Sequence, residues 1–157
     1  MYKIFYLPLD TLSRAAKLVL REKKIQFETI NEPIWKRRIE FLKINPEGSL
    51  PVIIDNDNIV IIGVLNLIEY LEEKKVGDNL LGKAVLERLE VRRIFRWIEI
   101  KMHKEVIDNI IDERVFKNIM GRGRPSAEAL KAGRSNLENH LKYFEWLLSK
   151  RTFLAGE

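Results

Sequence analysis

Short runs of apolar and β-branched residues alternate with helical patterns over the first half of the chain. Strands are predicted for residues 2–6, 27–30, 51–54 and 59–62, which are rich in Val, Ile, Phe and Tyr and flanked by turn-forming residues. Helices are predicted for residues 13–24, 35–42 and 64–74, where apolar positions recur at three- and four-residue spacing. The predicted order is therefore β-α-β-α-β-β-α.

The second half of the chain has a purely helical pattern. Apolar residues recur at helical spacing from Ala84 to Met120 with no proline, which predicts one long helix. The segment Gly121–Pro125 must end this helix. Ser126 is the predicted N-cap of a second helix, which we expect to pack antiparallel to the first.

This change of pattern sets the predicted fold class and domain organisation. An α/β N-terminal domain is expected over residues 1–75, followed by a linker with two glycines over residues 76–82. An all-α domain built on the two long helices is expected over residues 83–157. A chain of 157 residues has room for two such modest halves and little more.

Composition excludes several classes of protein. Hydrophobic residues make up 46% of the chain and charged residues 32%, which is typical of a globular protein. No apolar run reaches the roughly 20 residues of a membrane helix, and the N-terminus does not read as a signal peptide, so we expect a cytoplasmic protein without a membrane partner. The absence of cysteine excludes disulfides and thiolate chemistry.

The charge is moderately basic, with a formal net charge of +5. The loop that carries Arg122 and Arg124 is one of the basic segments, but acidic residues are mixed through most of the predicted helices. Solvated helix faces explain this pattern better than a nucleic-acid footprint, so no nucleic-acid partner is expected. His103 and His140 are too far apart to form a helical ligand pair, and no metal site is predicted.

A resemblance to a known family begins at Asn45. The run Asn45–Ile53 (NPEGSLPVI) resembles the N-P-x-G-x-V-P-x-L signature of glutathione S-transferases. The resemblance implies a thioredoxin-like N-terminal domain and a cis peptide bond before Pro51, for which a trans proline at the start of an edge strand is the alternative. It also implies that the main chain of Leu50 pairs with the cysteinyl unit of glutathione in the manner of an added strand.

The resemblance extends to a subgroup. Residues 31–38 and 120–136 are similar to a bacterial GST-like subgroup that includes a regulator of the division protein FtsZ. Membership would imply a scaffold used for binding rather than for conjugation, with a division protein as a partner. The long helices correspond to those of the family's dimer interface, so the resemblance also implies a homodimer.

The sequence departs from the family at the residues that should hold and activate glutathione. Asp10 and Thr11 fall where bacterial relatives have a Cys-Pro or Ser-Pro pair, so Ser13 is the remaining candidate for a catalytic hydroxyl, with the N-cap of the first helix as its alternative role. Gly63 and Val64 stand where the family places an acidic residue and a serine that hold the γ-glutamyl group. Glutathione is therefore expected to bind poorly, and no other cofactor is expected.

Three hypotheses about function follow. The first is a non-catalytic or weakly active binding protein with a degenerate glutathione site. The second is a glutathione transferase of unusual site chemistry. The third is a decayed fragment, because in the family the run FLAG, here residues 153–156, is followed by further helices. A shortened chain would leave apolar helix faces exposed and favour self-association.

Overall fold

The computed structural model describes residues 1–156. The chain divides into two compact units, the first covering Met1–Leu80 and the second beginning at Leu81. The domain bounds and the linker expected from the sequence stay a prediction.

Unit 1 contains a four-stranded sheet with the order β2-β1-β3-β4. Strand β1 runs parallel to β2 and antiparallel to β3, and β3 and β4 are antiparallel neighbours joined by a short turn. The four predicted strands are thus confirmed with small shifts at their ends. Their bounds are Tyr2–Tyr6 for β1, Phe27–Asn31 for β2, Val52–Ile54 for β3 and Val60–Ile62 for β4.

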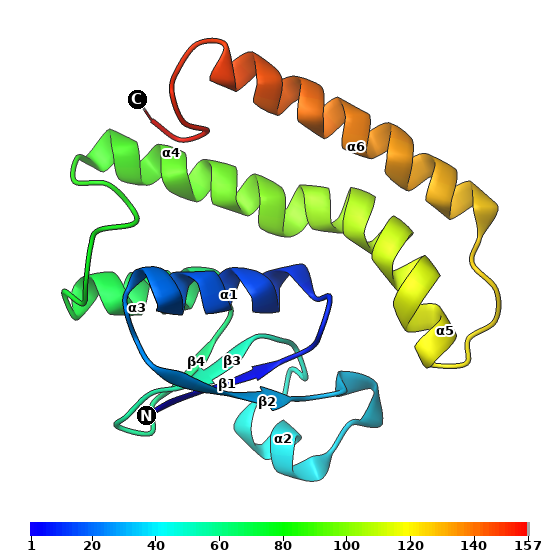
Figure 1. The fold of residues 1–157 in the computed structure, drawn as a ribbon, viewed down its shortest axis with the longest axis horizontal. Coiled ribbons are helices and arrows are strands. Elements are labelled where there is room, and N and C mark those ends of the chain that lie inside the picture. Colours follow the sequence, from blue (N-terminus) through cyan, green and yellow to red (C-terminus); the bar gives the residue numbers. More distant parts are fainter. Residues whose placement is uncertain (157) are drawn as a thin grey trace. The chain divides into compact units, whose positions relative to one another are not determined.

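Helices cover both faces of this sheet. Figure 1 shows α1 (Thr11–Glu22) and α3 (Val64–Glu73) together on one face and α2 (Ile39–Ile44) on the other. The helix predicted for residues 35–42 is confirmed only in part, because a single 3₁₀ turn, η1 (Ile34–Lys36), comes first and the α-helix begins at Ile39. Arg37 between them adopts a left-handed conformation with φ 44°, which a right-handed helix cannot continue.

Successive side chains of β1 point to opposite faces of the sheet, so this strand contributes to the core of unit 1 on both sides. Ile4 has no exposed surface, and its neighbour Phe5 points to the opposite face and packs against Phe41 of α2 with 5.5 Å between ring centroids. Val52 of β3 joins this second cluster. The sheet therefore fixes the positions of the loops at its two ends.

Unit 2 is helical, as the sequence predicts. The long predicted helix is continuous but changes type along its length, because its middle section has wider π-type turns in which the amide of Lys117 bonds to the carbonyl of Asp112, five residues back. Hydrophobic periodicity does not predict this change of helix type. The bounds are Val85–Arg96 for α4, Trp97–Phe116 for the π-type section η2, Lys117–Ile119 for α5 and Ala127–Leu148 for α6.

Helix α6 lies antiparallel alongside η2 (Figure 1). Ser126 caps it as predicted, since its hydroxyl accepts a hydrogen bond of 3.2 Å from the amide of Ala129. The two helices approach closely at Gly133, where a Cβ atom would lie 2.7 Å from Cγ1 of Ile110 and 2.9 Å from Cβ of Asn109. Glycine is required at this crossing because there is no space for a Cβ atom between the two helices.

Candidate functional site

The topology brings the positions selected from the sequence to one end of the sheet. Strand β1 ends at Tyr6 and leads to α1, and β2 runs parallel to it, so the segments after both strands lie at this end. Strand β3 is antiparallel to β1, so Pro51 before β3 and Gly63 after β4 lie at the same end. The amide of Gly63 donates a hydrogen bond of 3.0 Å to the carbonyl oxygen of Pro51. We call this the proline end of the sheet.

Asn45 builds the turn that precedes strand β3. The residue is 1% exposed, and its Nδ2 donates to the carbonyl oxygen of Ser49 at 3.0 Å while its Oδ1 accepts from the amide of Glu47 at 3.2 Å. The peptide bond between Leu50 and Pro51 is cis, as expected. The side chain of Leu50 packs on the cluster formed by Phe5, Phe41 and Val52.

The main chain of Leu50 remains open. Within residues 1–156, neither its amide nor its carbonyl oxygen forms a hydrogen bond in the turns and loops. An extended peptide could therefore pair with these groups, since two unpaired main-chain groups form the edge that strand addition requires. The role of Leu50 and Pro51 in binding glutathione stays a prediction.

The start of α1 differs from the expectation at Ser13. Asp10 is the N-cap, because its carboxylate accepts a hydrogen bond of 2.5 Å from the amide of Ser13. The alternative role of Ser13 as N-cap is therefore wrong. Ser13 has no exposed surface, and its hydroxyl accepts a hydrogen bond of 3.3 Å from the amide of Leu7. This contact holds the loop after β1 against the first turn of α1.

The start of α3 presents only main-chain groups. Gly63 is the N-cap residue with φ 84°, and no side chain caps this helix. A Cβ atom at Gly63 would meet nothing within 4 Å, so the space beside it is open. Val64 is 1% exposed and belongs to the core. An anion could reach amides at this helix start, but it would find no hydroxyl or carboxylate on Gly63 or Val64.

A buried ion pair at the proline end was not anticipated. Glu32 follows β2, its side chain has no exposed surface, and its Oε2 lies 2.5 Å from Nη2 of Arg38. The Arg38 Nε also donates to both carboxylate oxygens at 3.2 Å, and hydrogen bonding to Glu32 raises the pKa of Arg38 above its usual value. The Arg38 side chain remains 44% exposed, so a fixed cation stands at this end of the sheet. Both residues lie in the run 31–38 that resembles the bacterial subgroup, but that run does not predict their pairing, which depends on the turn around Arg37.

Unit 2 contains a polar chain that crosses from η2 to α6. The indole Nε1 of Trp97 donates to Nδ1 of His140 at 2.9 Å, and Nε2 of His140 lies 3.0 Å from a carboxylate oxygen of Glu105. Because Nδ1 accepts, the ring proton is assigned to Nε2. The ring of Trp97 also stacks on Tyr143 with 4.6 Å between centroids. These contacts place His140 in a structural cluster.

The turn between α5 and α6 is anchored below two exposed arginines. A carboxylate oxygen of Glu113 accepts from the amide of Ser126 at 2.6 Å and pairs with Nζ of Lys117 at 2.9 Å, and the bond from Ser126 is the main reason that the pKa of Glu113 is lowered. Arg122 and Arg124 are exposed and make no ion pair with any described residue.

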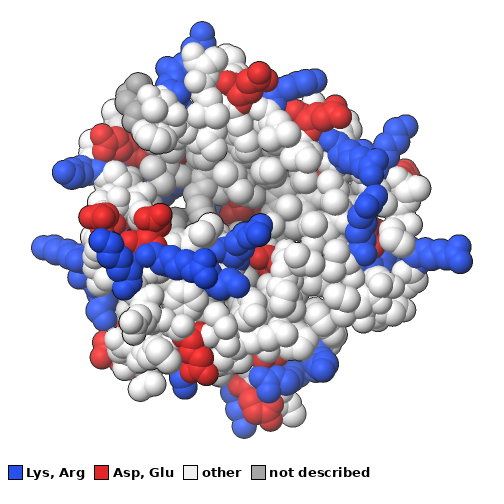
Figure 2. Space-filling model, viewed as in Figure 1, with Lys and Arg blue, Asp and Glu red and all other residues white. Residues whose placement is uncertain are grey.

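Charge elsewhere is mixed. Figure 2 shows Lys and Arg side chains interspersed with Asp and Glu on the face in view. Among residues 1–156, no group of three or more His, Asp or Glu side chains is arranged to hold a metal ion. The described helices include none that is long and apolar enough to cross a membrane.

Comparison with known proteins identifies the family. A sequence model of the glutathione S-transferase N-terminal domain matches residues 11–74. FtsZ-localized protein A of Caulobacter vibrioides is 35% identical over 156 residues, which cover 98% of this chain and 68% of that protein. The chain belongs to the glutathione S-transferase superfamily. Glutathione S-transferase F10 of Arabidopsis thaliana is 32% identical, and the aligned region covers 100% of this chain and 74% of that protein.

Solved structures of the family agree with the fold. A glutathione S-transferase from Rhodospirillum rubrum superimposes with a TM-score of 0.95 at 34% identity, covering 100% of this chain and 71% of that one. FzlA from C. crescentus gives the same TM-score and identity, covering 99% of this chain and 70% of its own. The predicted fold class, a thioredoxin-like N-terminal domain followed by a helical domain, is confirmed, and the chain falls with the FzlA-like members of the superfamily.

Proposed function

We propose that this member of the superfamily is a binding protein with a degenerate glutathione site. The observation that carries the proposal is the start of α3, where Gly63 has no side chain and Val64 is 1% exposed in the core. Two charge-assisted contacts to the γ-glutamyl group are thereby missing, and each is commonly worth about 1–3 kcal/mol. Weak binding of glutathione follows.

The start of α1 adds a second obstacle to conjugation. A hydroxyl that stabilises a thiolate must reach the bound sulfur, whereas Ser13 has no exposed surface and its oxygen accepts from the amide of Leu7. The carboxylate of Asp10 caps the same helix and would repel a thiolate there. Both features favour a role that does not depend on glutathione chemistry.

A protein partner is the more plausible ligand, and we propose FtsZ. The support is the 35% identity to a protein named for its localisation with FtsZ. The exposed guanidinium groups of Arg122 and Arg124 offer a surface for an acidic partner, because Glu113 holds the turn but leaves both side chains unpaired among the described residues. A cytoplasmic homodimer completes this proposal.

Two experiments test the proposal. Calorimetric titration with glutathione should detect no binding below the millimolar range, and a micromolar Kd would contradict the degenerate site. Co-sedimentation with FtsZ polymers should recover the wild-type chain, and the double variant R122E/R124E should lose most of the recovery because both cations are reversed. The matched control is Lys142→Glu, an exposed reversal on α6 that should bind as wild type. Equal recovery of all three proteins would contradict the proposed role of Arg122 and Arg124 in binding FtsZ.

Glutathione conjugation remains a second candidate because the main chain of Leu50 is unpaired within residues 1–156 and follows the intact Asn45 turn. Under this candidate Ser13 would activate the thiol after a movement of the loop at Leu7. Turnover of a chloronitrobenzene substrate that Ser13→Ala abolishes without loss of folding would favour this candidate. A cooperative unfolding transition of the purified chain would argue against the decayed fragment.

A further inference from the structure

The π-type section η2 is the least ordinary element of unit 2. It runs for 20 residues between α4 and α5, where Figure 1 shows the turns of the ribbon widening. In proteins π-type turns are rare and occur mostly as single turns inside α-helices, frequently at functional sites. A run of this length therefore needs contacts from outside the helix that favour it over the α form.

The main-chain carbonyl of Glu105, in the middle of η2, receives such a contact. In an α-helix this oxygen accepts a hydrogen bond from the main-chain amide four residues on, which belongs to Asn109. In the structure the side-chain Nδ2 of Asn109 donates to it at 2.9 Å, and Nδ2 of Asn136 donates to it from α6 at 3.1 Å. Side-chain amides thus bind the carbonyl that an α-helix would use for its own ladder.

The side chain of Glu105 is bound to α6 as well. Its Oε2 lies 3.0 Å from Nε2 of His140, while its Oε1 pairs with Lys101 of η2 itself. His140 follows Asn136 by four residues, so the two side chains lie on the same face of α6. Glu105 is therefore held at its main chain and at its side chain by two neighbouring positions of α6.

The close approach at Gly133 fixes the two helices against each other beside this point. A Cβ atom on Gly133 would collide with Ile110 and Asn109 of η2, so the helices touch there. Gly133 lies three residues before Asn136 and seven before His140, which places all three on one face of α6. This face meets the middle of η2 and engages its main chain, which side-chain packing alone would not do.

A change of helix type would alter what η2 presents to its surroundings. An α-helix has 3.6 residues per turn, whereas the π-type turns are wider, so conversion rotates successive side chains away from their present directions. The main-chain amide of Asn109 would then bond to Glu105 in place of the two side-chain amides. Helix α5 and the turn that carries Arg122 and Arg124 follow η2 directly, so conversion also changes how unit 2 presents these cations.

We propose that η2 is a conformational switch and that α6 holds it in the π form. The face of α6 formed by Gly133, Asn136 and His140 binds Glu105 and stabilises the wide turns. When Asn136 no longer donates to Glu105, the middle turns of η2 revert to α-type hydrogen bonds. The switch goes beyond the proposed function, because it depends neither on glutathione nor on the identity of a protein partner.

Asn136→Leu tests the switch, because leucine has a similar size but cannot donate a hydrogen bond. Nuclear magnetic resonance couplings between amide ¹⁵N and carbonyl ¹³C across hydrogen bonds identify the acceptor of each amide in the labelled full chain. In the wild type the middle of η2 should show couplings to carbonyls five residues back. In Asn136→Leu these couplings should be lost and replaced by couplings four residues back, including one from Asn109 to Glu105.

Asn139→Leu is the matched control, because it makes the same change at an exposed position of α6 and should keep the wild-type couplings. Should Asn136→Leu fail to fold, Asn109→Ala removes the other side-chain amide from Glu105 and should produce the same α-type couplings. Five-residue couplings that persist in the folded variant would overturn the proposal. Their loss in Asn139→Leu, or their absence from the wild-type chain, would overturn it as well.

Discussion

The amide of Gly63 donates a hydrogen bond of 3.0 Å to the carbonyl oxygen of Pro51. This bond ties the segment before β3 to the first turn of α3, although the two positions were selected from the sequence for different reasons. It also explains why the start of α3 needs a residue that tolerates φ 84°, because the amide must turn toward Pro51 while the helix leaves in another direction.

Replacement of Gly63 tests this backbone requirement. Gly63→Ala should destabilise unit 1 by about 1–2 kcal/mol, because an L-residue resists the left-handed φ while the added methyl group meets nothing within 4 Å. Urea unfolding followed by far-UV circular dichroism measures the loss. Ser135→Ala on the exposed surface of α6 is the control and should change the free energy of unfolding by no more than about 0.5 kcal/mol. An unchanged Gly63→Ala protein would contradict the argument.

Replacement of Gly133 tests close packing instead. Gly133→Ala should destabilise unit 2 by about 1–3 kcal/mol through overlap with Ile110 and Asn109, even though alanine raises helix propensity by about 1 kcal/mol. The same unfolding assay applies. Ser135→Ala again serves as control, since it adds no contact with η2. A Gly133→Ala protein that is more stable than wild type would contradict the prediction, because the gain in helix propensity would then exceed the cost of the steric overlap.

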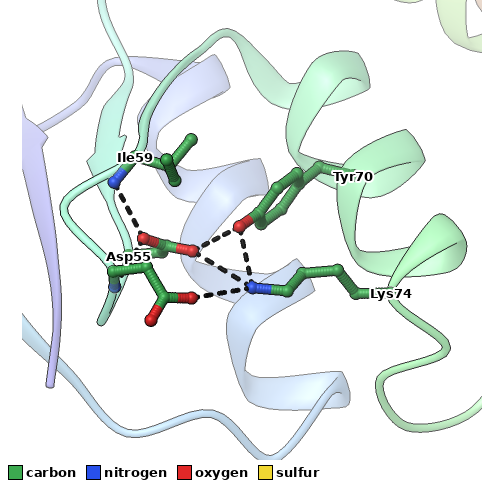
Figure 3. Close-up of polar contacts among 5 residues, drawn as sticks. Asp55, Ile59, Tyr70 and Lys74 are labelled. Carbon is green, nitrogen blue, oxygen red and sulfur yellow. Dashed lines mark hydrogen bonds and ion pairs between the residues drawn. The ribbon is translucent and has the colours of Figure 1, made fainter.

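Asp55 should make unit 1 sensitive to acid. The residue is 4% exposed, and although burial alone would raise its pKa, the hydrogen bonds from Tyr70 and from the amides of Ile59 and Asp57 lower the pKa below the usual value (Figure 3). A lowered folded-state pKa means that this stabilisation is fully present above the unfolded pKa of about 4 and is lost as pH falls through the folded value.

Asp55→Asn should therefore cost about 1–3 kcal/mol at pH 7, and the difference from wild type should shrink below about pH 4. Urea unfolding at a series of pH values gives both quantities. Asp57→Asn is the control, because the Asp57 side chain is 71% exposed and should change stability little. A wild-type to Asp55→Asn difference that stays constant down to pH 2 would refute the linkage.

His140 should be a structural residue of the η2–α6 contact. His140→Leu leaves the Trp97 indole N–H and one carboxylate oxygen of Glu105 without their partner, which should cost about 1–3 kcal/mol. Thermal unfolding followed by far-UV circular dichroism measures the loss. Asn139→Leu at an exposed position of the same helix is the control and should change stability by no more than about 0.5 kcal/mol. Equal losses for the two variants would argue against a special role of His140.

Local pattern was sufficient where neighbouring residues decide the structure. Strand β1 was predicted at residues 2–6 and lies there, and Ser126 caps α6 as its position before an apolar repeat indicated. The pattern failed where several local solutions compete. Asp10 and Ser13 are both good caps, and the path of the chain after Leu7 decides for Asp10. Arg37 breaks a helix that its composition allowed.

The candidate site was predictable in its location but not in its chemistry. The run Asn45–Ile53 marked the proline end, because its turn and its proline are specified within a few residues. The buried pair of Glu32 and Arg38 had no such mark, since neither its burial nor its geometry follows from sequence spacing.

By itself, the sequence determined the fold class and the family, because hydrophobic periodicity and one short motif are written in adjacent residues. Only the tertiary structure decided that Ser13 is enclosed, that Glu32 pairs with Arg38, and that His140 accepts a hydrogen bond from the indole N–H of Trp97. The physical reason is common to all three. Burial and hydrogen-bond partners are set by atoms brought together from distant parts of the chain, and no local pattern records them.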